Sequence, residues 1–144
     1  MVAENNAGSA RLTRATRKKL PANRVAPPED KLYTDQHDLL NDRVYERKKK
    51  EATQRRTFTS HYAPTCRTFS YAQAQHQQRS MEYPYGDLDR ARGPIRDSVV
   101  EDSKLAVRVI ALAKIHHALG DAFAIEHCWP TPLMQFQSMK ELLK

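Results

Sequence analysis

Large apolar side chains are scarce in this sequence of 144 residues. Leucine, isoleucine, valine and phenylalanine number 27 together, just under one fifth of the chain, a level at which chains tend to lack a core. Only 12 of the 27 precede Ser98. Ordering a residue costs about 1–2 kcal/mol, whereas burying a large apolar side chain returns about 1.5–3 kcal/mol. We therefore expect no independent globular core in the N-terminal two thirds.

Cysteine, glycine and long apolar runs are also scarce, and each absence excludes a class of protein. The two cysteines, Cys66 and Cys128, are too few for a disulfide framework, so we expect reduced thiols inside a cell. The four glycines are isolated, which excludes a phosphate-binding glycine loop. No apolar run approaches the roughly 18–20 residues of a membrane span, and we expect neither such a span nor a cleaved leader.

Positive charge is abundant, and it gathers in the first sixty residues. The net charge is +7, and residues 1–60 carry 14 Lys and Arg against 8 Asp and Glu. Within residues 1–30 three prolines and few apolar residues predict a basic extended arm. Its basic cluster comprises Arg11, Arg14, Arg17, Lys18 and Lys19. Such an arm suits an acidic protein surface or RNA, the alternative being a solvated tail, and the 17 acidic residues argue against a pure RNA-coating role.

Residues 31–56 predict a polar helix. Thr34 is placed to cap it, and acidic residues early and lysines late match the helix dipole. Its apolar strip is short, so this helix is either marginal or lies along a partner.

Residues 57–96 predict an irregular segment rich in proline and glutamine, with single aromatic residues. An isolated aromatic side chain on an irregular strand has nothing local to pack on, so we expect these side chains to fill pockets on a partner. The alternative is a disordered loop. The aromatic residues are Phe58, Tyr62, Phe69, Tyr71, Tyr83 and Tyr85.

Residues 97–144 predict a helical hairpin. Ser98 and Glu101 form a capping box at the start of a long helix that we expect to run from Asp97 to Cys128. Its apolar residues recur at spacings of four and three, and we expect this stripe to dock on a neighbour. Thr131 and Pro132 predict the start of a second, short helix over 133–143. The stripe comprises Leu105, Val109, Leu112, His116, Leu119 and Phe123. The fold class is thus predicted as mainly α, with extensive irregular and extended segments.

Potential metal ligands and nucleophiles occur without a decisive spacing. The two candidate groups are His61, Cys66 and His76, and Glu126, His127 and Cys128. Neither has the paired two-residue spacing typical of zinc sites, and nothing predicts a scaffold for a Cys-His hydrolase. We therefore predict a protein that is not an enzyme, with no catalytic residue, no metal, no cofactor and no small-molecule substrate.

The layout resembles the small proteins that bind inside or along the doublet microtubules of cilia and flagella. The resemblance rests on the segments SHYAP at 60–64 and EYPYG at 82–86, and it covers Lys31 to Cys128. It implies a structural protein of the cytoplasm and its cytoskeleton, a staple on the acidic surface of tubulin that reinforces the axonemal lattice and catalyses nothing.

We therefore expect an accessory subunit of a large assembly that stabilises the axonemal doublet microtubule. The alternatives are an RNA-bound accessory subunit of a cytosolic or mitochondrial ribosome, and an accessory subunit of a mitochondrial inner-membrane complex. The predicted partner-binding residues are Arg11, Arg14, Arg17, Lys18, Lys19, Phe58, Tyr62, Phe69, Tyr71, Tyr83, Tyr85, Leu105, Val109, Leu112, Leu119 and Phe123.

Overall fold

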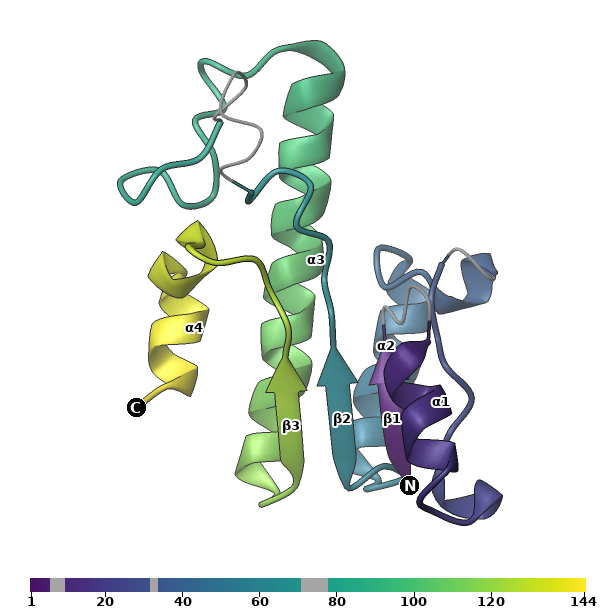
Figure 1. Ribbon diagram of the computed structural model, residues 1–144. Helices are drawn as coiled ribbons and strands as arrows, with labels where there is room; N and C mark the ends of the chain where they lie inside the picture. Colours follow the sequence, from purple (N-terminus) through teal and green to yellow (C-terminus); the bar gives the residue numbers. More distant parts are fainter. Residues whose placement is uncertain (6–9, 32–33, 71–77) are drawn as a thin grey trace. The chain divides into compact units, whose positions relative to one another are not determined.

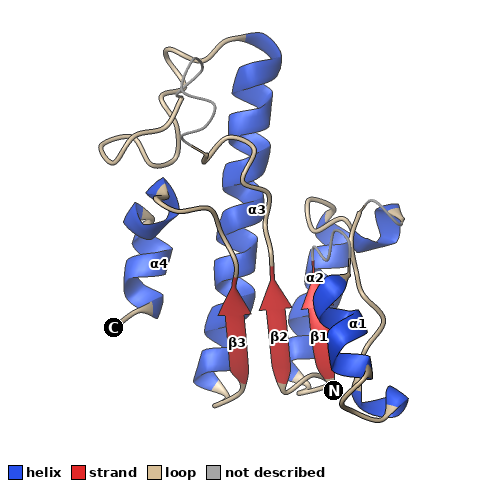
Figure 2. Cartoon of the chain, in the orientation of Figure 1, coloured by secondary structure: helices blue, strands red, loops and turns tan. Residues whose placement is uncertain are grey.

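The computed structural model describes residues 1–5, 10–31, 34–70 and 78–144, which divide into two compact units (Figure 1). The first unit comprises Met1–Ala63 and Leu112–Glu126, and the second comprises Pro64–Ala111 and His127–Lys144. The elements, coloured by type in Figure 2, are β1 (Val2–Asn5), α1 (Arg11–Arg17), η1 (Ala22–Arg24), η2 (Asp35–His37), α2 (Asp42–Thr53), β2 (Thr59–Tyr62), α3 (Gly93–Ala118), β3 (Ala122–Ile125), η4 (Pro132–Gln135) and α4 (Gln137–Leu142).

A small parallel sheet organises the first unit. Its three strands have the order β1-β2-β3, and Ser60 of β2 lies opposite Ala3 of β1 and Phe123 of β3. Parallel strands require long crossover connections, and here α1 and α2 lie between β1 and β2 in the chain, while α3 precedes β3. In Figure 1, α1 lies in front of β1 and α2 lies behind the sheet.

The first unit has a core of its own, so the prediction of no independent core in the N-terminal two thirds is wrong. Small and β-branched side chains that are far apart in sequence become buried together around the sheet, where no helical stripe would reveal them. The buried residues of this unit include Ala3, Val25, Leu39, Val44, Ala52 and Tyr62, with Leu112, Ala113 and His116 from the C-terminal end of α3.

Residues 1–30 are not an extended arm, because they form β1, α1 and η1. Thr13 of α1 donates hydrogen bonds from its backbone N–H, at 2.7 Å, and from its hydroxyl to the buried carboxylate of Glu4 in β1. Beyond α1 the chain returns along the strand, where the Ala26 N–H donates to the Val2 carbonyl oxygen at 2.8 Å. These bonds hold α1 to the edge of the sheet.

The helix predicted over 31–56 is shorter than expected. Asn41 caps α2, its side-chain oxygen accepting the Arg43 N–H at 2.9 Å. Thr34 instead caps the short η2, where it accepts the Gln36 N–H at 3.3 Å. A second capping residue close to the first therefore divides the predicted helix into a turn and a helix.

The long helix α3 differs from its predicted bounds at both ends. It begins at Gly93, so Ser98 lies inside the helix and the predicted capping box is wrong. It ends at Ala118, since Gly120 adopts a positive φ of 71° and the Asp121 N–H bonds back to the His116 carbonyl oxygen at 2.9 Å. A glycine in this left-handed conformation is a common helix end. β3 follows, so residues 97–144 are not a simple helical hairpin.

The second unit is built around a buried arginine. Arg79, only 5 % exposed, donates to the Thr68 hydroxyl at 3.0 Å and to the Val99 carbonyl oxygen at 2.8 Å. Its guanidinium carbon lies 3.9 Å from the centre of the Phe69 ring, and Thr68 in turn donates to the buried Asp102 carboxylate. Burial lowers the pKa of Arg79 to about 10, although the Asp102 carboxylate opposes this. This network fixes Thr68, Phe69 and Arg79 within the protein itself, although they belong to the segment 57–96 that was predicted to depend on a partner.

The C-terminal residues complete the second unit. Thr131 accepts the Leu133 N–H at 3.1 Å and Pro132 occupies the first turn of η4, so this predicted cap is confirmed. Phe136, Met139 and Leu142 are the buried side chains that follow. Among the described residues, no helix combines the length and the apolar character needed to cross a bilayer. The protein is mainly helical, as predicted, with the small sheet as an addition.

Candidate functional site

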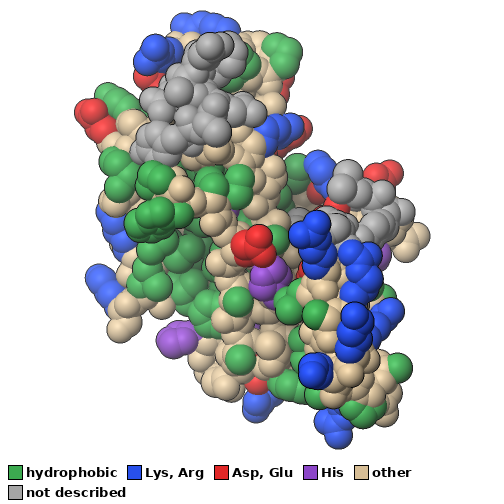
Figure 3. All heavy atoms as spheres, viewed as in Figure 1, with side chains coloured by type: hydrophobic (Ala, Val, Ile, Leu, Met, Phe, Trp, Pro, Cys, Tyr) green, Lys and Arg blue, Asp and Glu red, His purple; other side chains and the backbone are tan. Residues whose placement is uncertain are grey.

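Five exposed cations define a basic surface on and just after α1, here called the α1 surface. They are Arg11, Arg14, Arg17, Lys18 and Lys19. Figure 3 shows Lys and Arg side chains gathered over this part of the first unit. Among the described residues, none of the five forms an ion pair with a carboxylate. The predicted electrostatic residues therefore lie together, on a helix rather than on an extended arm.

The α1 surface is held in place from beneath and at its end. Thr13 is the buried residue of α1 and is bonded to Glu4, which leaves the basic side chains outside. The helix closes with hydrogen bonds from the Lys18 N–H to the Ala15 carbonyl oxygen at 3.2 Å and from the Lys19 N–H to the Thr16 carbonyl oxygen at 2.9 Å. Cations at the C-terminal end of a helix are favoured by its dipole.

Three of the predicted aromatic contacts are exposed. Phe58, Tyr83 and Tyr85 have exposed fractions of 44 %, 50 % and 43 %. Tyr85 is also anchored, because its ring stacks on that of Phe136 at a centroid distance of 4.0 Å. Tyr71 lies outside the described residues.

Two other predicted aromatic contacts are buried, so the prediction that they fill pockets on a partner is wrong. Tyr62 is 3 % exposed within the first unit, and Phe69 is 2 % exposed beneath the Arg79 guanidinium in the second. Aromatic rings that looked isolated in sequence find packing partners from distant segments of the same chain.

The apolar stripe of the long helix is also occupied by the protein itself. Leu105, Val109 and Leu112 are buried, which removes them as partner contacts. Leu119 follows the end of α3 and is half-buried, while Phe123 lies in β3 and is half-buried too. The predicted docking stripe is therefore a core-forming stripe that stops where the helix stops.

Trp129 is an exposed aromatic residue that sequence reasoning did not select. It is the single tryptophan and is 82 % exposed, more than any other large hydrophobic side chain described. Trp129 lies between Cys128 and Pro130, outside any helix or strand, and no periodic pattern in the sequence predicts its exposure.

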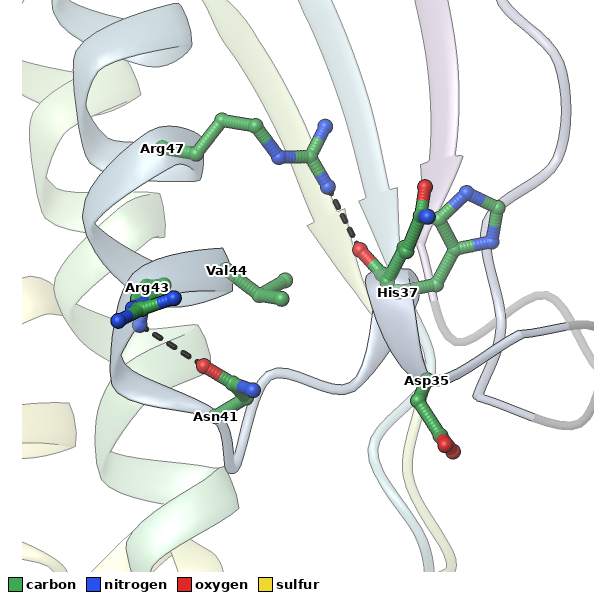
Figure 4. A pocket seen from close by; sticks show the side chains of 7 residues that line it. Asp35, His37, Asn41, Arg43, Val44 and Arg47 are labelled. Carbon is green, nitrogen blue, oxygen red and sulfur yellow. Dashed lines mark hydrogen bonds between the residues drawn. The ribbon is translucent and has the colours of Figure 1, made fainter.

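The cavity in Figure 4 lies in the first unit and is lined by residues of η2 and α2. It has a volume of about 510 Å³. The Arg47 guanidinium already has partners within the protein: it donates to the Gln36 carbonyl oxygen at 2.8 Å and pairs with the Glu51 carboxylate at 3.2 Å. The Asp35 side chain points away from Arg47 (Figure 4). The residues that line the cavity are Asp35, Gln36, His37, Asn41, Arg43, Val44 and Arg47.

A histidine and a carboxylate lie close together inside the first unit. Nε2 of His116 is 3.1 Å from the Tyr62 hydroxyl, and Nδ1 is 3.8 Å from the Asp121 carboxylate, which accepts from Arg55 at 2.7 Å. Burial lowers the pKa of His116, an effect that Asp121 opposes, and burial raises the pKa of Tyr62. The His116 and Asp121 side chains are each only 1 % exposed, so both lie in the interior of the first unit.

A second polar cluster, formed by Cys66, His127 and Cys128, is half-buried in the second unit. Burial raises the pKa of the Cys128 thiol to about 11, and the neighbouring Cys66 thiol adds to this rise. Burial lowers the pKa of His127, while backbone groups of Cys128 and Thr65 oppose the change. The expectation of no metal was based on spacing, and it missed this grouping because Cys66 and Cys128 are 62 positions apart.

No protein family, curated protein or solved structure matches this chain. The functional argument therefore rests on the geometry of these surfaces. Of these surfaces, the α1 surface has the clearest complementary partner, because its five cations, which pair with no carboxylate in the described part of the chain, attract an extended array of carboxylates or phosphates.

Proposed function

We propose that this protein is a non-enzymatic accessory subunit of a large assembly, and that it binds an acidic surface of that assembly through the α1 surface. The observation that carries the proposal is the set of five exposed cations on α1 and the two residues after it, none of which pairs with a described carboxylate. In the free protein these exposed cations stay hydrated, and on binding the acidic groups of a partner take the place of the water.

The strength of this interaction follows from the number of contacts. A surface ion pair contributes about 0.2–1 kcal/mol, so five of them contribute about 1–5 kcal/mol. That range corresponds to about fivefold to several thousandfold in affinity. Because the bonds between Thr13 and Glu4 already order α1, binding adds no cost for ordering its backbone to the loss of side-chain and rigid-body freedom.

The partner we propose is tubulin in the doublet microtubule of a cilium or flagellum, where the protein would reinforce the axonemal lattice. Two arguments support this partner: the resemblance carried by residues 60–64 and 82–86, and the match between a basic surface and acidic tubulin. In this proposal the exposed rings of Phe58, Tyr83 and Tyr85 supply further contacts, since aromatic residues are enriched among those that dominate binding energy.

Co-sedimentation with microtubules tests the proposal. The test variant changes all five α1-surface cations to Gln, and we expect its affinity to fall at least about tenfold at low salt, with a smaller difference at high salt. The matched control removes the same number of exposed charges from the second unit, as Arg90→Gln, Arg92→Gln, Arg96→Gln, Lys140→Gln and Lys144→Gln. An equal loss in both variants would show that net charge, and not the α1 surface, drives binding.

A labelled single-stranded RNA, measured under the same salt conditions, provides the second arm. Binding to RNA with a steep salt dependence, together with no co-sedimentation with microtubules, would reject tubulin and favour the RNA-bound accessory subunit. If neither polymer binds, the α1 surface is not a docking site for an acidic polymer and the proposal fails.

A further inference from the structure

Three metal-ligating side chains from two distant parts of the sequence meet in the second unit. Their donor atoms are the sulfurs of Cys66 and Cys128 and one imidazole nitrogen of His127, and all lie within 4.8 Å of one another. Both thiols are free, and all three side chains are half-buried. The cluster thus combines soft ligands with access from solvent.

The backbone holds the two cysteines together. The Cys128 N–H donates to the Cys66 sulfur at 3.0 Å, which joins the two segments at the cluster itself. Cys66 also begins a turn, since its carbonyl oxygen accepts the N–H groups of Phe69 at 3.1 Å and Ser70 at 3.0 Å. These backbone hydrogen bonds fix the Cys66 sulfur beside Cys128.

The imidazole is oriented by packing. The His127 ring meets the Phe69 ring edge-on at a centroid distance of 4.8 Å, and Phe69 is itself fixed beneath the Arg79 guanidinium. Nδ1 of His127 lies 3.5 Å from the Cys128 sulfur and 2.9 Å from the Thr131 hydroxyl oxygen. These contacts hold Nδ1 of the imidazole beside the Cys128 sulfur, and Nε2 is buried without a hydrogen-bond partner among the described residues.

We propose that Cys66, His127 and Cys128 bind one zinc ion as two thiolates and an imidazole. Tetrahedral bonds of about 2.3 Å to sulfur and about 2.0–2.1 Å to nitrogen set these donor atoms about 3.5–3.8 Å apart, so the side chains close inward by up to about 1 Å. Thiolate and imidazole ligands select zinc over magnesium and calcium. Binding releases the thiol protons, and one coordination position stays open to water or to a side chain of a partner.

Cobalt and zinc titrations of the full-length, reduced and chelator-treated protein test this site. We expect Co²⁺ to bind at one equivalent with the thiolate-to-cobalt charge-transfer absorption and the intense d–d bands of a tetrahedral complex, and we expect Zn²⁺ to displace it. The single tryptophan, Trp129, adjoins Cys128, so its fluorescence should change at the same stoichiometry. Absence of the charge-transfer band, or binding only at many equivalents, would overturn the proposal.

Single substitutions then assign the ligands. Cys66→Ser, Cys128→Ser and His127→Asn should each weaken zinc binding more than about 100-fold, beyond the 10–100-fold typical of residues that only support a ligand. His117→Asn is the matched control, since His117 is exposed and lies in the first unit. Unchanged affinity in any of the three ligand variants would contradict the three-ligand site.

Thiol protection in the wild-type protein gives a readout that does not depend on any variant folding. One equivalent of Zn²⁺ should slow alkylation of both Cys66 and Cys128 at least about tenfold, because a coordinated thiolate is a poorer nucleophile than a free one. Equal rates with and without zinc, or loss of both thiols to a disulfide in the presence of zinc, would show that the cluster does not hold the metal.

Discussion

Gly86 is a residue whose replacement should test the packing of the second unit. Its φ is 100°, and a Cβ atom added there would collide with the side chain of Val99, which is fully buried. Overpacking costs about 1–3 kcal/mol, and a left-handed conformation costs about 1–2 kcal/mol for a residue with a Cβ atom. We expect Gly86→Ala to lower the free energy of unfolding by about 3 kcal/mol in urea titrations.

Gly93 provides the matched control for this prediction. It also has a positive φ, of 52°, but a Cβ atom there would meet nothing within 4 Å. Gly93→Ala should therefore cost only the backbone part, about 1 kcal/mol. Equal losses from the two substitutions would show that Val99 yields to the new methyl group.

At the scale of elements, the sequence predicts a long helix with a periodic apolar stripe but does not predict the short strands. The stripe through Leu105 and Val109 predicted a buried helix face, and both residues are buried. The strands are only four residues long, so alternation has little length in which to show itself. Gly120 followed by alternating small and large residues was the available signal that α3 ends and β3 begins, because glycine ends helices readily.

Site residues were predictable where charge alone decides and unpredictable where distant segments meet. The five cations of the α1 surface are exposed because lysine and arginine side chains stay hydrated. Phe69 was misassigned because its partner Arg79 lies ten positions further along the chain, and no periodic pattern in the sequence predicts this pairing. The same holds for Cys66 and Cys128, which only the fold brings together.

Arg79 connects Thr68 to Val99 of α3, so its replacement should loosen the contact between these two parts of the second unit. Arg79→Met keeps the length of the side chain but removes the donor to the Thr68 hydroxyl and to the Pro84 carbonyl oxygen, whereas the Val99 carbonyl oxygen still accepts from the Ser103 hydroxyl. Each unsatisfied buried group costs about 1–3 kcal/mol, so we expect a loss of about 3 kcal/mol or more. Amide hydrogen exchange should speed up in the segment around Phe69, ahead of global unfolding.

Arg90→Met serves as the control, because Arg90 is exposed. Surface substitutions of this kind usually change stability by less than about 0.5 kcal/mol. Protection around Phe69 that survives in Arg79→Met would mean that apolar packing, and not the arginine network, orders the segment.

At the scale of the whole molecule, a folded core changes the role proposed for a partner. A chain that folds only on binding loses part of its binding energy to ordering, whereas α1 is already fixed through Thr13 and Glu4. The basic surface and the thiol–imidazole cluster belong to different units. Zinc binding and binding to an acidic surface are therefore separable experimentally, since the variants that test one leave the residues of the other intact.

Global stability should fall in mild acid because of His116. Burial holds the pKa of His116 below its ordinary value of about 6.5, so the unfolded chain binds a proton at a pH where the native protein does not. Stability is therefore complete above about pH 6.5 and is lost as the pH falls from there toward the lowered pKa. One such proton gives a slope of up to about 1.4 kcal/mol per pH unit. Urea titrations between neutral pH and pH 5 measure it.

His116→Gln should flatten this pH dependence at the cost of some stability at neutral pH, because glutamine still offers polar atoms to Tyr62 and Asp121 but does not titrate. His127 also has a lowered pKa and contributes a slope of its own, so the difference between wild type and His116→Gln isolates the buried histidine. His117→Gln, on the exposed side of α3, is the control for replacing a histidine by glutamine on this helix. If the stability of wild type and of His116→Gln had the same pH slope, the Asp121 carboxylate would have to compensate fully for the burial of the imidazole. That result would contradict the lowered pKa of His116.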